Sequence, residues 1–476
     1  MSTGASFFDA GVWSPVLQFT LILASLLIAT VIKQKVRFLK SSLIPVSVLG
    51  GILLLAVSVV FKSARGEYIF NLPIFSSGSE RSGIESLEIL TYHCLAVGFI
   101  AMTLRKAKKK AGKDRAAEVF NTGLLTVNTY LMQAALGLII TIAASFAIPR
   151  LLKASGILLA FGYGQGTGQA LNYGSIYEGY GFVGGKSFGL TVAALGFLSA
   201  SICGVIYLGI QKKRGNLNIR VEKNVLNREK VEDEGEIPMV ESIDKITIQI
   251  ALVAVSYAIT YVLMACLGSL VGDGMRSTIF GFNFLFGALV AVVIKAVMSL
   301  LMKKKIMKRD YINNFLLNRI GGFAFDIMIV AGIGAIQIDL IKDYWLVLAI
   351  MGVVGALSTY YYDHFVCFRL FPKYPHEQFL ASFGMLTGTA STGVILLREI
   401  YPNFETPASE NLVYQNFPAI VFGFPLMLLA SYAPKGDVNA YITLGIIAVA
   451  FVVLNIVLLR ARIFKGKATR AASGKK

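Results

Sequence analysis

The sequence predicts an all-α polytopic membrane protein: two inverted five-helix repeats, each with a re-entrant hairpin, plus one extra C-terminal helix. Its 476 residues are 55% hydrophobic and only 15% charged, with a mean hydropathy of +0.67, whereas a soluble domain carries roughly 25% charged residues. Apolar runs of about 20 residues recur along the chain, as membrane-spanning helices require. Two Gly- and Thr-rich stretches interrupt these runs at matching places.

Eleven apolar runs are expected to span the membrane. They cover residues 15–32, 42–61, 86–104, 121–147, 187–210, 246–270, 278–301, 313–338, 345–367, 411–432 and 438–460. The stretches 154–178 and 376–398 are only partly apolar. Because no basic region precedes the first apolar run, we expect no cleaved signal peptide.

The distribution of Lys and Arg predicts the orientation. These residues cluster in segments 33–40, 105–115 and 303–309 and in the C-terminal tail, and such clusters remain on the cytoplasmic side of a membrane. Eleven spans with an outside N-terminus place every cluster and the C-terminus inside, provided that neither Gly-rich stretch crosses. We therefore expect 154–178 to enter and leave from outside, and 376–398 from inside.

The same order of spans and hairpin is expected in two halves. Residues 1–210 form the first predicted repeat and 246–432 the second, while 433–476 adds one span and a basic tail. Segment 211–245 mixes charges with Gly and Asn, which indicates a flexible cytoplasmic linker. Each half has an odd number of spans, so the halves run in opposite directions. Inverted repeats are typical of secondary transporters.

The two Gly-rich stretches also share sequence. The first contains FGYGQGT at 161–167 and the second FGMLTGT at 383–389; at an offset of 222 residues, Phe, Gly, Gly and Thr coincide. Backbone inside a membrane must be satisfied or line a watery cavity, and Gly permits a helix to break there. Exposed carbonyls and hydroxyls suit Na⁺, and N–H groups at a helix N-terminus suit a carboxylate. We predict a site where the breaks meet, although close helix packing also uses such small residues.

The candidate site residues follow from this placement. Asp326 lies in the apolar run GGFAFDIMIV, where a charge costs about 2.5–3.5 kcal/mol to insert, so it is a candidate for Na⁺ or a substrate ammonium, against a hydrogen-bonded pair with another helix. Asn128 and Gln133 either face the first hairpin or serve packing. The substrate-binding candidates are Gly166, Thr167, Gly168, Gln169, Gly388, Thr389, Ser391, Thr392 and Asp326. The cation-binding candidates are Gly164, Gln165, Thr387, Asn128 and Gln133.

The remaining unusual residues inside apolar runs are expected to be structural. Lys295 is expected to snorkel to the inside or to pair. The histidines show no metal-ligand spacing and the cysteines no pairing pattern. No nucleophile–base motif or paired carboxylates indicate an enzyme, we expect no organic cofactor, and the net charge of +18 lies between the spans, which argues against a nucleic-acid partner. The residues concerned are His93, His364, His376, Cys94, Cys203, Cys266 and Cys367.

Over most of residues 15–432 the chain resembles the bacterial sodium/glutamate symporters. The motifs that carry the resemblance are IPVSVLGG at 44–51 after Phe38-Leu39-Lys40, Met132-Gln133, GQGTG at 164–168, Tyr180-Gly181-Phe182, and Phe383–Thr392. That family has two inverted five-helix repeats, re-entrant hairpins that meet near the midplane and a dimeric scaffold, and its members are thought to work as elevators. The resemblance implies Na⁺-coupled glutamate uptake by a homodimer in the bacterial inner membrane.

Two departures at the hairpin tips leave the substrate open. Gln165 stands where the family typically has His, and Thr389–Thr392 reads TAST where the family has Ala-Thr-Pro-Thr. Another small carboxylate or amino acid, coupled to Na⁺ or to H⁺ through Asp326, is therefore an alternative. An ion channel is a second alternative, because Gly- and Thr-rich re-entrant loops also build selectivity filters.

Overall fold

The computed structural model describes residues 10–75, 82–106, 113–215, 244–270, 276, 279–307, 309–398, 400, 407–408, 411–412 and 415–473. Within this part the regular elements are helices, and ten of them are long and apolar enough to cross a membrane. The chain is therefore an all-α, multi-pass membrane protein, as its composition predicts. Most of the predicted linker 211–245 and of the basic segment 105–115 lies outside the described residues.

Most of the long helices follow the predicted spans to within about five residues, but α5 begins eight residues before its predicted span and α18 ends 13 residues after its own. Their bounds are α1 Ala10–Lys35, α3 Val46–Arg65, α4 Gly83–Leu104, α5 Lys113–Ser145, α7 Gly185–Lys213, α8 Lys245–Leu270, α10 Asn283–Lys303, α11 Asn314–Gly334, α13 Trp345–Leu370 and α18 Asp437–Ser473. The shorter helices are α2 Arg37–Ser41, α6 Leu158–Glu178, α12 Ile338–Ile341, α14 Pro375–Leu386, α15 Ala390–Arg398 and α17 Asn416–Tyr432.

One predicted span is shorter than expected. The run 411–432 contains α17, which has 17 residues from Asn416 to Tyr432. A helix that crosses a bilayer needs about 20 residues. The described part of the chain therefore contains ten helices of spanning length where the sequence predicts eleven spans.

Helix ends coincide with local stop and start signals. The helix α3 ends at Gly66, whose φ of 83° only glycine adopts easily, and the Gly66 N–H donates to Lys62 O at 2.7 Å. Ser82 caps α4 by accepting from Glu85 N, and Asn313 caps α11 through its side chain. These signals fix three of the helix ends, but not how a helix is rotated about its axis.

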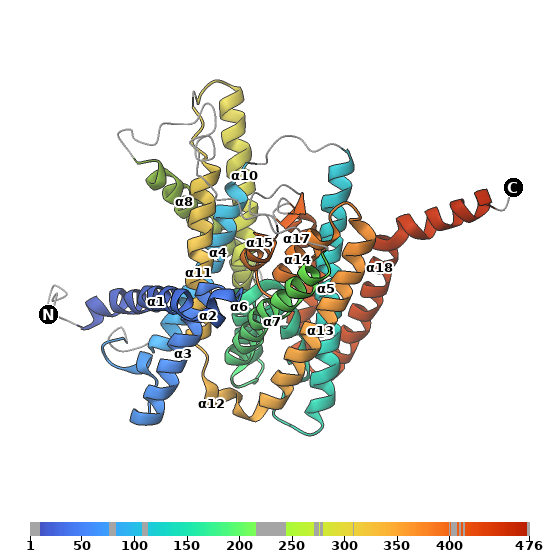
Figure 1. Ribbon diagram of the computed structural model, residues 1–476. Coiled ribbons are helices and arrows are strands. Elements are labelled where there is room, and N and C mark those ends of the chain that lie inside the picture. The colour runs from blue at the N-terminus through green and yellow to red at the C-terminus, as the bar shows by residue number, and fades with distance from the viewer. Residues whose placement is uncertain are drawn as a thin grey trace.

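The helices form two groups, with α6 and α7 between them (Figure 1). We call α1, α3, α4, α8, α10 and α11 the first body, and α5, α13, α14, α15, α17 and α18 the second body. The helices α6 and α7 pack against members of both bodies. Packing in the first body is reciprocal: α1 lies on α3 and α3 on α11, while α8 lies on α10 and α10 on α4. The first Gly-rich stretch therefore lies where the bodies meet, and α14 of the second stretch packs against both α6 and α7.

Candidate functional site

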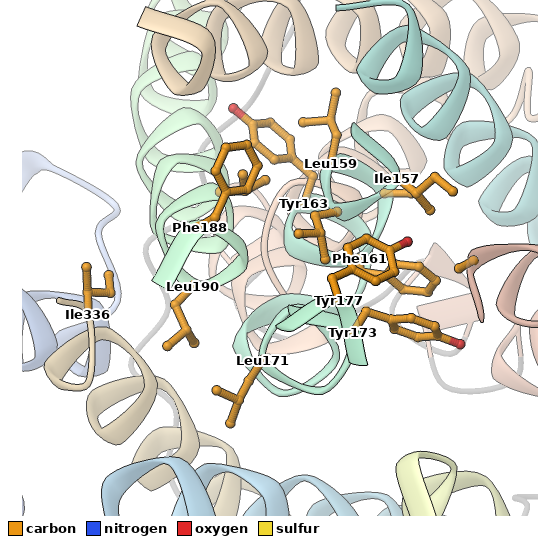
Figure 2. Close-up of a cluster of buried hydrophobic side chains, with 14 of the residues drawn as sticks. Ile157, Leu159, Phe161, Tyr163, Leu171, Tyr173, Tyr177, Phe188, Leu190 and Ile336 are labelled. Carbon is orange, nitrogen blue, oxygen red and sulfur yellow. The ribbon is translucent and has the colours of Figure 1, made fainter. Parts of the chain in front are cut away.

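The first Gly-rich stretch folds back on itself at Gly166. This residue interrupts α6 with φ 77° and ψ −169°, a conformation that is essentially restricted to glycine. The rings of Phe161 and Tyr173, on either side of the break, stack with centroids 3.9 Å apart (Figure 2). Twelve residues of uninterrupted helix would separate them by about 18 Å. The predicted break is thus present, and α6 consists of two arms in contact.

The second Gly-rich stretch breaks over residues 387–389, between α14 and α15. Its arms also touch, because a Cβ atom added at Gly384 would lie 2.7 Å from the Cα atom of Gly393. Only glycines permit backbones to approach so closely. The break again falls where the matched Gly and Thr of the sequence stand.

The two breaks meet, although they are 222 residues apart. A Cβ atom added at Gly166 would lie 3.1 Å from Thr389 Cγ2 and 3.5 Å from Gly388 O. Phe197 of α7 covers both breaks, since its ring is 3.9 Å from that position and 3.0 Å from the corresponding position at Gly388. The structure thus brings together Gly166, Gly388 and Thr389, three of the residues that the sequence predicts to share a site.

The alternating glycines of GYGQGTG each face a different neighbour. A Cβ atom would crowd α7 at Gly162, the Tyr130 ring of α5 at Gly164, and α4 and α11 at Gly168. Only Gly166 has the unusual backbone angles. Three of the four glycines therefore serve close packing, and the Gly164 carbonyl, predicted to bind a cation, accepts from the Tyr130 hydroxyl at 3.1 Å.

The hydroxyl groups at the breaks differ in their bonding. Thr167 donates to Met328 O of α11 at 3.4 Å, so its hydroxyl does not bond to its own helix. Thr387 donates back to the carbonyl four residues earlier at 2.6 Å. Thr389 and Thr392 approach each other at 3.5 Å. Of these hydroxyls only that of Thr387 donates to its own helix, so those of Thr167, Thr389 and Thr392 are better placed to bind a ligand.

Gln169 lies in the first turn after Gly166 and is only 1% exposed. Within the described part of the chain neither its Oε1 nor its Nε2 has a hydrogen-bond partner. A long side chain on a helix leans toward the helix N-terminus, which places this amide over the break. A buried polar group without a partner is costly, so Gln169 is suited to bind a polar ligand there.

Polar residues of α5 bind carbonyls at both breaks. Tyr130 donates to Gly164 O at 3.1 Å, and Gln133 Nε2 donates to Leu386 O and to Thr359 Oγ1, both at 2.8 Å. Gln133 Oε1 has no partner among the described residues. These contacts place Gln133 beside the second break, and its Oε1 lies 3.3 Å from the position of a Cβ atom at Gly164, so Gln133 also faces the first Gly-rich stretch, one of the two roles that the sequence left open.

Asp326 is not at the meeting point. Residues Met328 and Gly332 of α11 face Thr167, and a position two residues from Met328 lies on the other side of a helix. The Asp326 side chain is exposed and faces Ser47 of α3. Its predicted role in substrate binding is therefore not supported by its position.

The other candidates are placed as follows. Asn128 is buried beside Tyr362 of α13, and neither of its amide atoms has a hydrogen-bond partner in the described chain. Gln165 directly precedes the first break and is half-buried, and Ser391 lies in the first turn of α15. Of the predicted cation ligands, only Thr387 and Gln133 lie at the second break.

Asp363 was missed by the sequence reasoning. It lies in α13 with 0% exposure, and its Oδ1 accepts from Thr129 Oγ1 at 2.8 Å. An acid inside an apolar run is a functional candidate by default, and the run 345–367 contains Asp363 as plainly as 313–338 contains Asp326. The available signal was therefore the same one that singled out Asp326.

The residues expected to be structural have local partners. Lys295 donates to the carbonyls of Thr103 and Arg105 at 2.7 and 3.0 Å, at the C-terminal end of α4, so it pairs with backbone. His93 and His376 bond tyrosine hydroxyls at 2.7 and 2.6 Å. No group of three or more His, Cys, Asp or Glu residues that could hold a metal occurs among the described residues.

Comparison of the chain with protein-family models and with curated proteins finds no match. Chemically, the meeting point offers two helix N-termini, at Thr167 and Ala390, together with hydroxyls and an amide. Helix N-termini carry a partial positive charge and unpaired N–H groups, so this arrangement can bind an anion.

Proposed function

We propose that the chain is a secondary active transporter that takes up glutamate, or a related small anionic amino acid, together with Na⁺. The observation that carries the proposal is the contact of the two helix breaks, with the unpartnered amide of Gln169 buried beside it. Broken helices whose N-termini converge within a membrane protein are the typical site for a substrate carboxylate in secondary transporters.

The inverted repeat and the elevator mechanism belong to this proposal. Reciprocal packing of α3 on α11 and of α10 on α4 is what two inverted halves would produce. The breaks lie at the boundary between the first and second bodies, where movement of one body against the other would expose a site alternately to the two sides. The stretches at Gly166 and at 387–389 are proposed to be re-entrant hairpins from opposite sides, and the chain is proposed to act as a homodimer.

Two other functions remain as alternatives. H⁺ could replace Na⁺ as the coupling ion, and a different small carboxylate could replace glutamate. A channel is less well supported, because channels usually gain their pore from several subunits around one axis, whereas here the breaks come together within one chain.

Transport is tested with purified full-length protein in proteoliposomes. Uptake of radiolabelled glutamate, aspartate and small dicarboxylates would be measured with an imposed Na⁺, H⁺ or K⁺ gradient. We expect saturable uptake that needs Na⁺, and we expect substrate and Na⁺ to raise each other's affinity by the same factor. Flux that does not saturate would favour a channel, and identical substrate affinity in NaCl and choline chloride would exclude the coupling.

Orientation in the bacterial inner membrane is tested by cysteine labelling in intact cells. The segment 105–115 and the tail after 460 should react only after the membrane is permeabilised, and the segment after Arg65 should react from outside. Labelling of residue 110 from outside would contradict the proposed N-outside, C-inside topology.

A further inference from the structure

We infer that Asp363 and Thr129 form the core of a binding site for a monovalent metal cation, between α13 and α5. The inference rests on the proposed function for the identity of the cation, Na⁺. Its core lies between α13 and α5, and the sequence did not single out Asp363 or Thr129 as ligands.

Asp363 is a buried carboxylate with half of its hydrogen-bonding capacity unused. Its Oδ1 accepts from Thr129 Oγ1 at 2.8 Å, while its Oδ2 has no partner among the described residues. None of the ion pairs recorded between described residues involves Asp363. A buried carboxylate without a compensating positive charge is strongly unfavourable, so a cation is the missing partner.

The neighbouring groups supply further oxygen atoms. One turn along each helix, Gln133 of α5 and Thr359 of α13 are bonded to each other at 2.8 Å, and Gln133 Oε1 has no partner in the described chain. Residues four apart lie on one helix face, so Thr129 and Gln133 share a face, as do Thr359 and Asp363. Carboxylate, hydroxyl and amide oxygens are the ligands that hard cations prefer.

A metal cation explains this cluster better than a proton on Asp363. A proton would give Asp363 Oδ2 a hydrogen to donate, but it would leave Gln133 Oε1 without a donor. The orientation of the Gln133 amide is fixed, because its Nε2 donates to Leu386 O as well as to Thr359. The two acceptors without a donor among the described residues, Asp363 Oδ2 and Gln133 Oε1, are both oxygen atoms. A cation can bind several oxygen atoms at once.

The cluster is connected to the second break through Gln133. Gln133 Nε2 donates to Leu386 O, the last carbonyl of α14 before the break, while its Oε1 lies 3.3 Å from the position of a Cβ atom at Gly164. A cation bound near Asp363 and Gln133 would therefore hold the end of α14 in place. Because coupling between two sites is reciprocal, an anion at the breaks would in turn raise the affinity for the cation.

The test uses thermal unfolding of purified full-length protein, without substrate, over a titration of NaCl for choline chloride at constant ionic strength. Asp363→Asn and Thr129→Val remove the proposed ligands. Thr126→Val is the matched control, because Thr126 is a buried threonine of the same helix that bonds Gln415 Oε1 at 3.1 Å instead. We expect Na⁺ to stabilise the wild type and Thr126→Val with the same half-saturating concentration. Thr129→Val should need about ten-fold more Na⁺, and Asp363→Asn should not respond.

Each other outcome overturns the inference. If Asp363→Asn and Thr129→Val are stabilised by Na⁺ with the wild-type concentration dependence, the cation does not bind at Asp363 and Thr129. Stabilisation by low pH in place of Na⁺, lost in Asp363→Asn, would make Asp363 a proton site. If Asp363→Asn does not fold, the comparison of Thr129→Val with Thr126→Val decides alone. Failure of the transport proposal is a separate result, namely a wild type that takes up no small anion, because the Na⁺ response is measured without substrate.

Discussion

The two helix breaks share four residues in register but are built differently. At the first break, one residue reverses the chain, and Gly166 takes backbone angles that other residues avoid. At the second break, three residues separate α14 from α15, and Gly388 is not among the glycines with positive φ in the described chain. There a Cβ atom would instead lie 2.8 Å from Thr392 Oγ1 and 3.0 Å from Phe197 Cδ1.

The difference shows that matched glycines can be required for different reasons. The first break needs glycine for its conformation, and the second needs it for space. The side chains that follow also differ: Gln169 stands at the position matched by Ser391 in the second half.

The largest effect is expected for Gly166→Ala. A residue with a side chain in that conformation costs about 1–3 kcal/mol, and the added methyl group would press on Thr389, so uptake should be lost and the melting temperature should fall. The melting temperature of Gly388→Ala should fall less, because the side chains of Thr392 and Phe197 can shift to make room for the methyl group. Gly445→Ala on α18, where a Cβ atom meets nothing within 4 Å, is the control and should gain about 0.5–1 kcal/mol. If Gly166→Ala and Gly388→Ala lose the same amount of melting temperature, the two glycines are not required for different reasons.

Gln169→Leu is expected to separate binding from stability. Leu is similar in volume and lacks the two buried, unpartnered polar atoms, so the melting temperature should stay the same or rise. Substrate affinity should fall more than ten-fold, because hydrogen bonds to a charged ligand contribute about 1.5–3 kcal/mol. Isothermal titration and differential scanning fluorimetry measure the two quantities. A lower melting temperature with unchanged affinity would make Gln169 a packing residue.

Thr→Val substitutions compare the hydroxyls at the breaks. Thr167→Val or Thr389→Val should weaken substrate binding by roughly ten-fold, since these hydroxyls retain capacity for a ligand. Thr387→Val should change affinity little, because its hydroxyl bonds only its own helix at 2.6 Å. If Thr167→Val and Thr389→Val both bind substrate with wild-type affinity, the substrate site does not lie at the breaks.

Asp326→Asn is expected to have the smallest effect. The side chain is exposed on the side of α11 away from the breaks, so substrate and Na⁺ affinities should stay within about two-fold of the wild type, a change of under 1 kcal/mol. A ten-fold loss of either affinity would indicate that the ligand binds between α11 and α3, where Asp326 lies. The same measurements on Asp363→Asn provide the contrast.

The sequence by itself determined the class of protein and the positions of both breaks. The number, length and composition of apolar runs are properties of the chain, and a bilayer imposes helices of about 20 residues on them. Glycine at Gly166 and Gly388, within otherwise apolar stretches, marked where those helices are interrupted. The recurrence of four residues at one offset also paired the two breaks before any contact between them was known.

Only the tertiary structure decided which side chains face the breaks. A helix that faces lipid on one side and protein on the other is apolar on both, so the pattern of residues does not reveal its rotation about its axis. Asp326 and Asp363 stand in equally apolar runs, yet the rotation of α11 leaves Asp326 exposed, while that of α13 buries Asp363 against Thr129. The partner of each buried polar group is set by helix packing, and packing is a property of the whole fold.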